Sequence, residues 1–267
     1  MPLQFKLAVS SSSATGCLKS VQRYTVHASS CIISLLILTA WGKTRRAAWG
    51  ETKMARIEIN IRGLFATPVA AVELPDAEAR NAELRRLILA RRDAHASVQA
   101  SNAGGWHSDR ALEEWGGQRV AEILTAARQV ANRMTSDRNG VLLKPVWAIQ
   151  AWANVNGPGD GNICHYHPGS FWSGTYYVDD GGSAADPSLG GEFEMIDPRG
   201  PGPGMYAPAL KFAGEDGASV GSAETIRPRP GLLLLFPSWL LHQVRPYRGD
   251  GLRISIAFNL SVASHPG

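Results

Sequence analysis

The chain has 267 residues, of which 44% are hydrophobic and 19% are charged, and this composition excludes an intrinsically disordered protein. The formal net charge of +4 is unevenly distributed, because residues 1–53 hold seven Lys and Arg against one acid, Glu51. The remainder keeps 20 of the 27 basic and 22 of the 23 acidic residues. Since this larger part is slightly acidic, we expect it to bind neither nucleic acid nor an anionic membrane surface.

The first 53 residues do not have the sequence pattern of a folded domain. They lack a consistent hydrophobic period and differ in charge from the rest, which is typical of a disordered extension, or of residues that precede a true start at Met54. The apolar run from Cys31 to Trp41 is shorter than the roughly 20 residues that span a bilayer. We therefore expect a single domain over 54–267, with no membrane segment.

The three cysteines, Cys17, Cys31 and Cys164, show no paired spacing. A disulfide scaffold is therefore not expected, and a reducing, cytoplasmic location is. Cys164 precedes His165 in an expected strand, where neighbouring side chains point to opposite faces. We expect Cys164 to be a packed core residue.

The first part of the domain, 54–145, is predicted to supply a strand and supporting helices. Ile57, Ile59 and Ile61 alternate with polar residues, which indicates a strand. Apolar residues at helical spacing follow Pro75 and Asp76, which are natural helix start signals. The expected elements are a strand at 57–61, helices over 77–96 and 118–134 outside the main sheet, and a loop over 101–108.

From about residue 146 to 262 the pattern is that of a β domain. Short runs of alternating or continuous apolar residues are separated by clusters of Gly, Pro and Asp, which is typical of a sandwich or barrel, including the cupin-like jelly roll. The fold class is thus mainly β with flanking helices. The expected strands cover 146–156, 163–167, 172–178, 191–196, 231–236 and 252–260.

Two histidines in this region, His165 and His167, are spaced to point to one face of a strand. Two adjacent imidazoles suit a metal ion, although a pair of solvated or hydrogen-bonded histidines has the same spacing. A third, His242, follows the apolar run 232–236 and a turn. It is either a further ligand or a surface residue.

Arg253 is predicted to face inward. It shares one face of its strand with Ser255, Ala257 and Asn259, while the other face is apolar. A buried guanidinium needs an anionic partner, and no acid in the same segment obviously serves. A bound dicarboxylate would serve, through a bidentate contact with Arg253 and the Ser255 hydroxyl.

Taken together, these residues and their neighbouring stretches resemble a bacterial and phage family of 2-oxoglutarate/Fe(II)-dependent oxygenases related to the prolyl 4-hydroxylases. Any one matching stretch is weak, but their ordered set is specific. The stretches are Leu64–Pro68, Gly105–Ser108, Trp152–Asn154, His165–Ser170, Ser173–Tyr177, Asp197–Arg199, Pro230–Gly231, Phe236–Trp239, His242 and Arg253–Ser255.

The resemblance implies a double-stranded β-helix with Fe(II) at the open end of the barrel and 2-oxoglutarate as cosubstrate. His165 and His242 match metal ligands, and Arg253 with Ser255 matches the group that holds the far carboxylate of 2-oxoglutarate. Asn154 and Tyr177 are candidates for further hydrogen bonds to it, although core packing explains Tyr177 almost as well. Such enzymes use oxygen to hydroxylate a substrate, here a small molecule or peptide side chain, while 2-oxoglutarate becomes succinate.

His167 stands where related oxygenases usually have Asp or Glu, and the resembled family itself has His-x-His there. His167 is then a third neutral ligand, or it is displaced by water or by Glu192 or Glu194, or the site prefers another metal. Two rival functions stay open: a three-histidine cupin-type dioxygenase that needs no 2-oxoglutarate, and a non-catalytic metal-binding jelly roll. The oligomeric state is not predicted.

Overall fold

The structure is a computed structural model that describes residues 6–10, 21–28, 31–38, 65–200, 207, 209 and 223–263. It divides into two compact units, Met1–Arg62 and Gly63–Gly267. In the first, strands β1 (Lys6–Ser10), β2 (Val21–Ala28) and β3 (Cys31–Leu38) form an antiparallel sheet in that order. Most of the segment 1–53, and the strand predicted at 57–61, lie outside the described residues.

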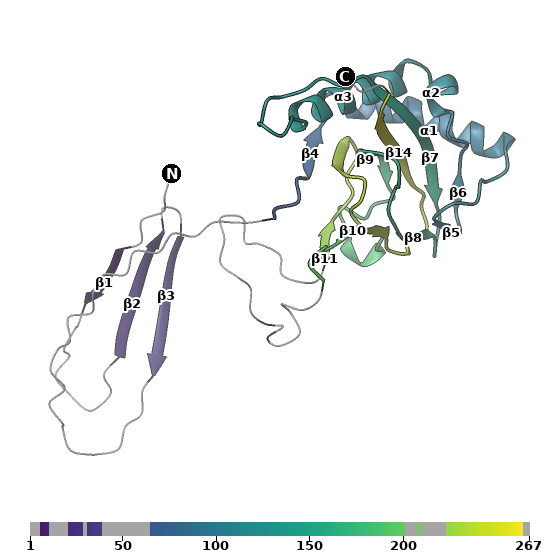
Figure 1. Cartoon of the computed structure of the whole chain (residues 1–267). Helices are drawn as coiled ribbons and strands as arrows, with labels where there is room; N and C mark the ends of the chain where they lie inside the picture. Colours follow the sequence, from purple (N-terminus) through teal and green to yellow (C-terminus); the bar gives the residue numbers. More distant parts are fainter. Residues whose placement is uncertain are drawn as a thin grey trace, which may run out of the picture. The chain divides into compact units, whose positions relative to one another are not determined.

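The second unit is built on two antiparallel sheets (Figure 1). The six-stranded sheet has the order β4-β12-β9-β14-β7-β6, and the five-stranded sheet has the order β11-β10-β13-β8-β5. The strands are β4 (Ala70–Glu73), β5 (Asn102–Ala103), β6 (Trp106–His107), β7 (Trp147–Asn156), β8 (Gly161–His165), β9 (Trp172–Asp180), β10 (Phe193–Ile196), β11 (Ala223–Ile226), β12 (Leu232–Pro237), β13 (His242–Val244) and β14 (Arg253–Val262).

Three α-helices, α1 (Ala77–Ala94), α2 (Leu112–Trp115) and α3 (Gly117–Met134), accompany the sheets, with a 3-10 turn η1 (Pro187–Leu189). The helices contact β9, β12 and β7 of the six-stranded sheet, and Figure 1 shows them grouped next to this sheet. None of the helices in the described part of the chain is long and apolar enough to cross a membrane. The two predicted long helices are confirmed to within two residues, whereas the loop predicted over 101–108 contains the two-residue strands β5 and β6.

A hydrophobic core lies between the helices and the six-stranded sheet. Ile88 of α1 and Ile123 of α3 are fully buried against apolar side chains of β9, β12 and β14. The strand β14 contributes every second residue to this core: Ile254, Ile256, Phe258 and Leu260. Phe258 crosses β9 so closely that a Cβ at Gly174 would lie 2.4 Å from its ring, which explains a glycine in mid-strand.

The opposite face of β14 carries Arg253, Ser255, Ala257 and Asn259, as the alternation predicted. Three of these residues, Arg253, Ser255 and Ala257, line a pocket between the two sheets. A second, smaller core closes the space around this pocket, formed by Tyr177, Phe193, Met195, Leu232, Leu234, Phe236 and Leu240. The expected double-stranded β-helix is thus present, with a partly polar pocket between its two sheets.

We propose that residues 1–53 are dispensable for the second unit, since the chain divides at Arg62. A chain that begins at Met54 is expected to unfold at the same temperature and to bind metal with the same affinity as the full chain. Calorimetry and metal titration of the two proteins check this. A lower unfolding temperature of the shortened chain would contradict it.

Candidate metal and 2-oxoglutarate site

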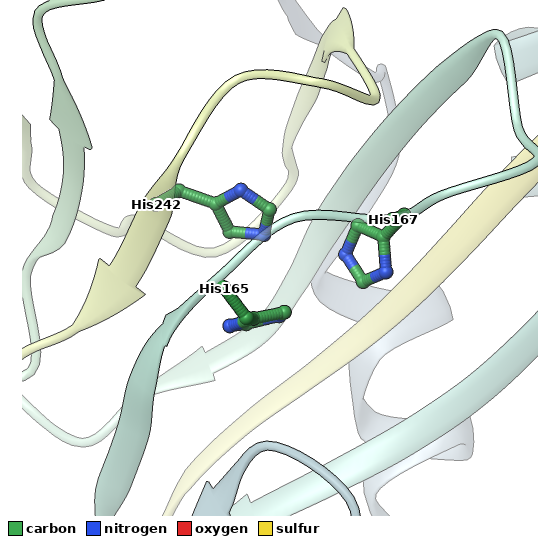
Figure 2. Close-up of side chains that lie close together, drawn as sticks. All are labelled: His165, His167 and His242. Atoms are coloured by element: carbon green, nitrogen blue, oxygen red, sulfur yellow. The ribbon is translucent and has the colours of Figure 1, made fainter.

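Three imidazoles converge at one end of the pocket: His165 at the end of β8, His167 just beyond it, and His242 at the start of β13 (Figure 2). One nitrogen atom from each ring lies within 4.8 Å of those from the others. The ring centroids are 4.4 Å apart for His165 and His242, 4.9 Å for His165 and His167, and 5.1 Å for His167 and His242. The structure therefore brings the three predicted ligands together.

Two of these rings are oriented by backbone carbonyl groups. Nδ1 of His165 lies 2.7 Å from the carbonyl oxygen of Ile163, and Nδ1 of His242 lies 2.7 Å from that of Leu240. A carbonyl oxygen only accepts hydrogen bonds, so Nδ1 must carry the proton in both rings. The lone pair of each neutral ring is then on Nε2, which is the arrangement that a metal-binding histidine requires.

His167 reaches the cluster by a different route from the one predicted. The prediction placed His165 and His167 on one face of a strand that extends to 167, but β8 ends at His165. The backbone N–H of His167 donates instead to the carbonyl oxygen of Ser238 (2.9 Å), in the turn between β12 and β13. The position of His167 is thus fixed by the turn that precedes His242.

The strand β8 is also irregular. His165 pairs with His242 but Asn162 pairs with Val244, so three steps along β8 match two along β13. Such a bulge interrupts the alternation of side chains. The prediction that Cys164 is a packed core residue is wrong, since Cys164 is exposed. It belongs to the five-stranded sheet, whereas the helices pack on β7, β9 and β12 of the six-stranded sheet.

Burial keeps the three imidazoles neutral. It lowers the pKa of His242 to about 3, with a further contribution from the nearby His165. Burial also lowers the pKa of His167 to about 4, assisted by His165 and by the positive charge of Arg110. The pKa of His165 is lowered by burial as well. All three rings can therefore offer a lone pair at neutral pH.

These shifts predict that the metal-free protein is sensitive to acid. In the unfolded chain the rings bind protons near their ordinary pKa of 6.5, whereas folded His242 does so only near pH 3. Between these values the unfolded state binds more protons, so the free energy of unfolding falls as the pH falls below about 6.5. Unfolding temperatures measured from pH 7 to pH 4 check this. The His242→Gln variant should show a shallower decline; an equal decline would contradict the assignment.

The two acids considered as substitutes for His167 do not join the cluster. Glu194 accepts hydrogen bonds from Gln243 and from Nη2 of Arg245, the latter at 2.7 Å. In the pairing of β10 with β13, Met195 rather than Glu194 is opposite His242. Within the described residues, no carboxylate is part of the group of possible ligands that contains the three histidines.

Arg253 is buried deeper in the same pocket, with 1% of its surface exposed. Its Nε donates to the carbonyl oxygen of Gly191 (2.9 Å), and its Nη1 lies 3.4 Å from Oδ1 of Asn156 and 3.5 Å from Oγ of Ser255. Its guanidinium also lies over the ring of Tyr177, 5.3 Å from the centroid. No described carboxylate forms a salt bridge with Arg253, although burial lowers its pKa.

The other predicted cosubstrate residues surround Arg253. In the pairing of β14 with β9 and β7, Ser255 lies between Tyr177 and Asn154. A bulge between Ile254 and Ser255 sets this register, and bulges often redirect side chains at functional sites. Oδ1 of Asn154 is buried and has no hydrogen-bond partner among the described residues. The Tyr177 hydroxyl is also buried, and the nearby guanidinium of Arg253 interacts with it. Burial raises the pKa of Tyr177 to about 12, so its hydroxyl remains a donor.

Sequence reasoning did not single out several residues in or next to the pocket. Asn156 does not line the pocket but lies opposite Arg253 on β7 and contacts its Nη1, and the alternation from Asn154 could have indicated it. Trp152 lines the pocket, stacks on His107 (5.6 Å between centroids) and contacts the ring of His167 (5.8 Å). No local pattern indicates these contacts, because His107 comes from β6, far away in the sequence.

Comparison with known proteins agrees with this geometry. Residues 150–259 match the model of a family described as "Putative 2OG-Fe(II) oxygenase". This segment runs from β7 to β14 and contains the three histidines and Arg253. No curated protein matches the chain.

Solved structures of low sequence identity share the fold. A prolyl 4-hydroxylase from Pseudomonas putida is 16% identical, with a TM-score of 0.51 over 74% of this chain and 94% of its own. A prolyl hydroxylase from Trichoplax adhaerens, in complex with a peptide fragment of hypoxia-inducible factor, is 15% identical, with a TM-score of 0.52 over 74% of this chain and 87% of its own. The α-ketoglutarate-dependent epimerase SnoN of nogalamycin biosynthesis is 13% identical, with a TM-score of 0.52 over 74% and 77%.

The fold is thus the jelly roll of the 2-oxoglutarate-dependent oxygenases. Residues 150–259 are thus similar to the 2OG-Fe(II) oxygenases, and this similarity indicates an enzyme that uses Fe(II) and 2-oxoglutarate.

Proposed function

We propose that the protein hydroxylates its substrate, with Fe(II) held by His165, His167 and His242 and with 2-oxoglutarate held against Arg253. The observation that carries this proposal is the combination, in one pocket, of three converging neutral imidazoles and a buried arginine that lacks a carboxylate partner among the described residues. The first feature supplies metal ligands and the second requires an anion.

The residues fit the metal. Imidazole nitrogen suits Fe(II), along with zinc, copper and nickel, and the two carbonyl contacts at Ile163 and Leu240 leave Nε2 of His165 and His242 free to coordinate. Three ligands on one side of an ion leave positions open for a cosubstrate and oxygen. Because the three proposed ligands are imidazoles, the protein adds no negative charge to the bound metal ion. The positive charge of the ion then favours binding of a dianionic cosubstrate.

The residues also fit 2-oxoglutarate. Arg253 and Ser255 offer donors to its far carboxylate, and the buried hydroxyl of Tyr177 offers another next to them. An unpaired buried polar group costs free energy, so a ligand that pairs with these groups is stabilised. Oδ1 of Asn154 is unpartnered, and rotation of this amide by 180° would present its NH2 group instead.

When bound, Fe(II) and 2-oxoglutarate supply the oxidation: oxygen converts 2-oxoglutarate to succinate and carbon dioxide as a substrate C–H becomes C–OH. The protein orients the cosubstrate through Arg253. Two buried side chains next to His242 limit the access of water to the site. They are Phe193 and Phe236, whose ring centroids lie 5.3 and 4.9 Å from that of the His242 imidazole.

Arg253 also distinguishes this proposal from its main rival. A three-histidine dioxygenase that binds its substrate directly has no need of a buried cation on the strand that follows the distal histidine. Succinate formation separates the possibilities. We expect succinate to form only when Fe(II), oxygen and 2-oxoglutarate are all present, and not when Zn(II) replaces Fe(II). Substrate oxidation without 2-oxoglutarate would favour the rival instead.

A further inference from the structure

We infer that Arg110 binds an anionic group of the substrate at the mouth of the pocket, so the substrate class is that of carboxylates and similar anions. This inference rests on the proposed function, because it places the substrate on the side of the metal that 2-oxoglutarate leaves open. Four observations support it: the contacts of Arg110, its place on the pocket wall relative to Arg253, the charge of the pocket, and the hydrogen bonds that occupy the carboxylate of the neighbouring Asp109.

Arg110 lies in the segment between β6 and α2, beside the central part of β7. The backbone N–H of Ser108 donates to the carbonyl oxygen of Ala153 (3.0 Å), and Ala111 forms a bridge with Ala151. These contacts place the guanidinium of Arg110 over the indole of Trp152, 5.9 Å from its centroid. Because Trp152 lines the pocket and contacts the ring of His167, Arg110 is one aromatic ring away from the metal ligands.

The side chain of Arg110 is exposed and has no ion pair or hydrogen bond with any residue that the structure describes. Its neighbour Asp109 cannot neutralise it, because that carboxylate accepts hydrogen bonds from Nη2 of Arg91 (2.9 Å) and from Nε1 of Trp115 (3.1 Å). The exposed guanidinium of Arg110 can therefore bind an anion from solvent.

Arg110 and Arg253 belong to different parts of the pocket wall. On β14, Arg253 is four residues from Ala257, and Ala257 is opposite Trp152 on β7. Four residues of a strand span about 13 Å at ~3.3 Å per residue. In the proposed function both carboxylates of 2-oxoglutarate are engaged, the far one by Arg253 and the near one at the metal. Arg110 is then left to bind a second anion.

The charge of the pocket favours such an anion. None of its lining residues in the described part of the chain is Asp or Glu, whereas Arg253 is a buried cation. The charge of Asp180, opposite Arg253 on β9, acts on this guanidinium, but the Asp180 carboxylate accepts hydrogen bonds from the backbone N–H groups of Gly182 and Ala184. A histidine rather than an acid at 167 removes one negative charge from the metal site. An anionic substrate is therefore repelled less than it would be beside an aspartate.

Benzoate and benzamide test this inference, because they have the same flat ring and nearly the same size but differ in charge. Each is titrated calorimetrically, without oxygen, into the full chain saturated with Fe(II) and 2-oxoglutarate. We expect benzoate to bind at least about tenfold more tightly than benzamide. The Arg110→Gln variant should lose this preference, and Arg110→Lys should retain most of it. The control is Arg86→Gln, which removes one charge from the exposed face of α1 and should leave the preference unchanged.

Equal affinity of the wild-type protein for the two probes, including no binding of either, would overturn the inference. A preference for benzoate that survives Arg110→Gln would overturn it as well. The proposed function fails in a different way, because a protein that does not bind 2-oxoglutarate gives no response when this cosubstrate is added before the probes. If 2-oxoglutarate binds and the charge preference is absent, only the role of Arg110 is wrong.

Discussion

Replacing Arg253 with Gln is expected to weaken 2-oxoglutarate binding by on the order of 100-fold or more, while the affinity for the metal changes little. The guanidinium is almost fully buried and has no carboxylate partner among the described residues. Its charge-assisted contact with a cosubstrate carboxylate would therefore form in a largely desolvated site. The three histidines do not touch Arg253 in the described contacts, so the metal ligands should stay in place.

Calorimetric titration with 2-oxoglutarate, and separately with metal, measures the two affinities. Arg253→Lys keeps the charge but loses the planar fork, and an intermediate affinity is expected. The matched control is Arg85→Gln, since Arg85 forms an ion pair with Asp179 at the surface. If Arg253→Gln binds 2-oxoglutarate as tightly as the wild-type protein, the cosubstrate lies elsewhere and Arg253 is only a structural residue.

Replacing His165 or His242 with Ala is expected to abolish metal binding, because each removes one of three ligands whose nitrogen atoms converge. His167→Asp is expected to behave differently. The carboxylate would restore the common two-histidine, one-carboxylate set, and an anion replaces a neutral donor. This variant should still bind Fe(II), at least as tightly as the wild-type protein.

Metal content after anaerobic loading with Fe(II) and dialysis measures these effects, with His95→Ala as the control at an exposed position. Full metal content in His242→Ala would contradict the proposed ligand set. For His167, the decisive comparison is His167→Ala. If this variant binds metal as the wild-type protein does, His167 is not a ligand, although the oxygenase class would be unaffected.

Much of the fold could be predicted because it depends on local periodicity. The apolar face of β14 and the stripes of α1 and α3 are visible in the sequence, and each is buried as expected. Short elements such as β13 and α2 were missed, since three or four residues carry no measurable period. Whether Arg253 faces inward was also predictable, from the contrast between its polar neighbours on one face and the apolar residues on the other.

Features that depend on pairing between distant strands could not be predicted. The bulge in β8 shifts the register of this strand against β13, and the turn at Ser238 positions His167. Neither has a signature in the local sequence, because both arise from the register with β13 and its preceding turn. The contact between Arg110 and Trp152 likewise joins segments about forty residues apart. The engagement of Glu194 by Arg245 is of the same kind, and it removes a ligand candidate that sequence reasoning had left open.

Anaerobic titration of the Fe(II)-loaded protein with 2-oxoglutarate tests the central claim most directly. A weak visible metal-to-ligand charge-transfer band requires iron and a chelating 2-oxoglutarate in the same site. We expect this band to appear and saturate with one equivalent of cosubstrate in the wild-type protein, and to be absent from His242→Ala. In Arg253→Gln it should require a far higher concentration of 2-oxoglutarate. Saturated iron without any such band in the wild-type protein would contradict the claim that the three histidines and Arg253 form one oxygenase site.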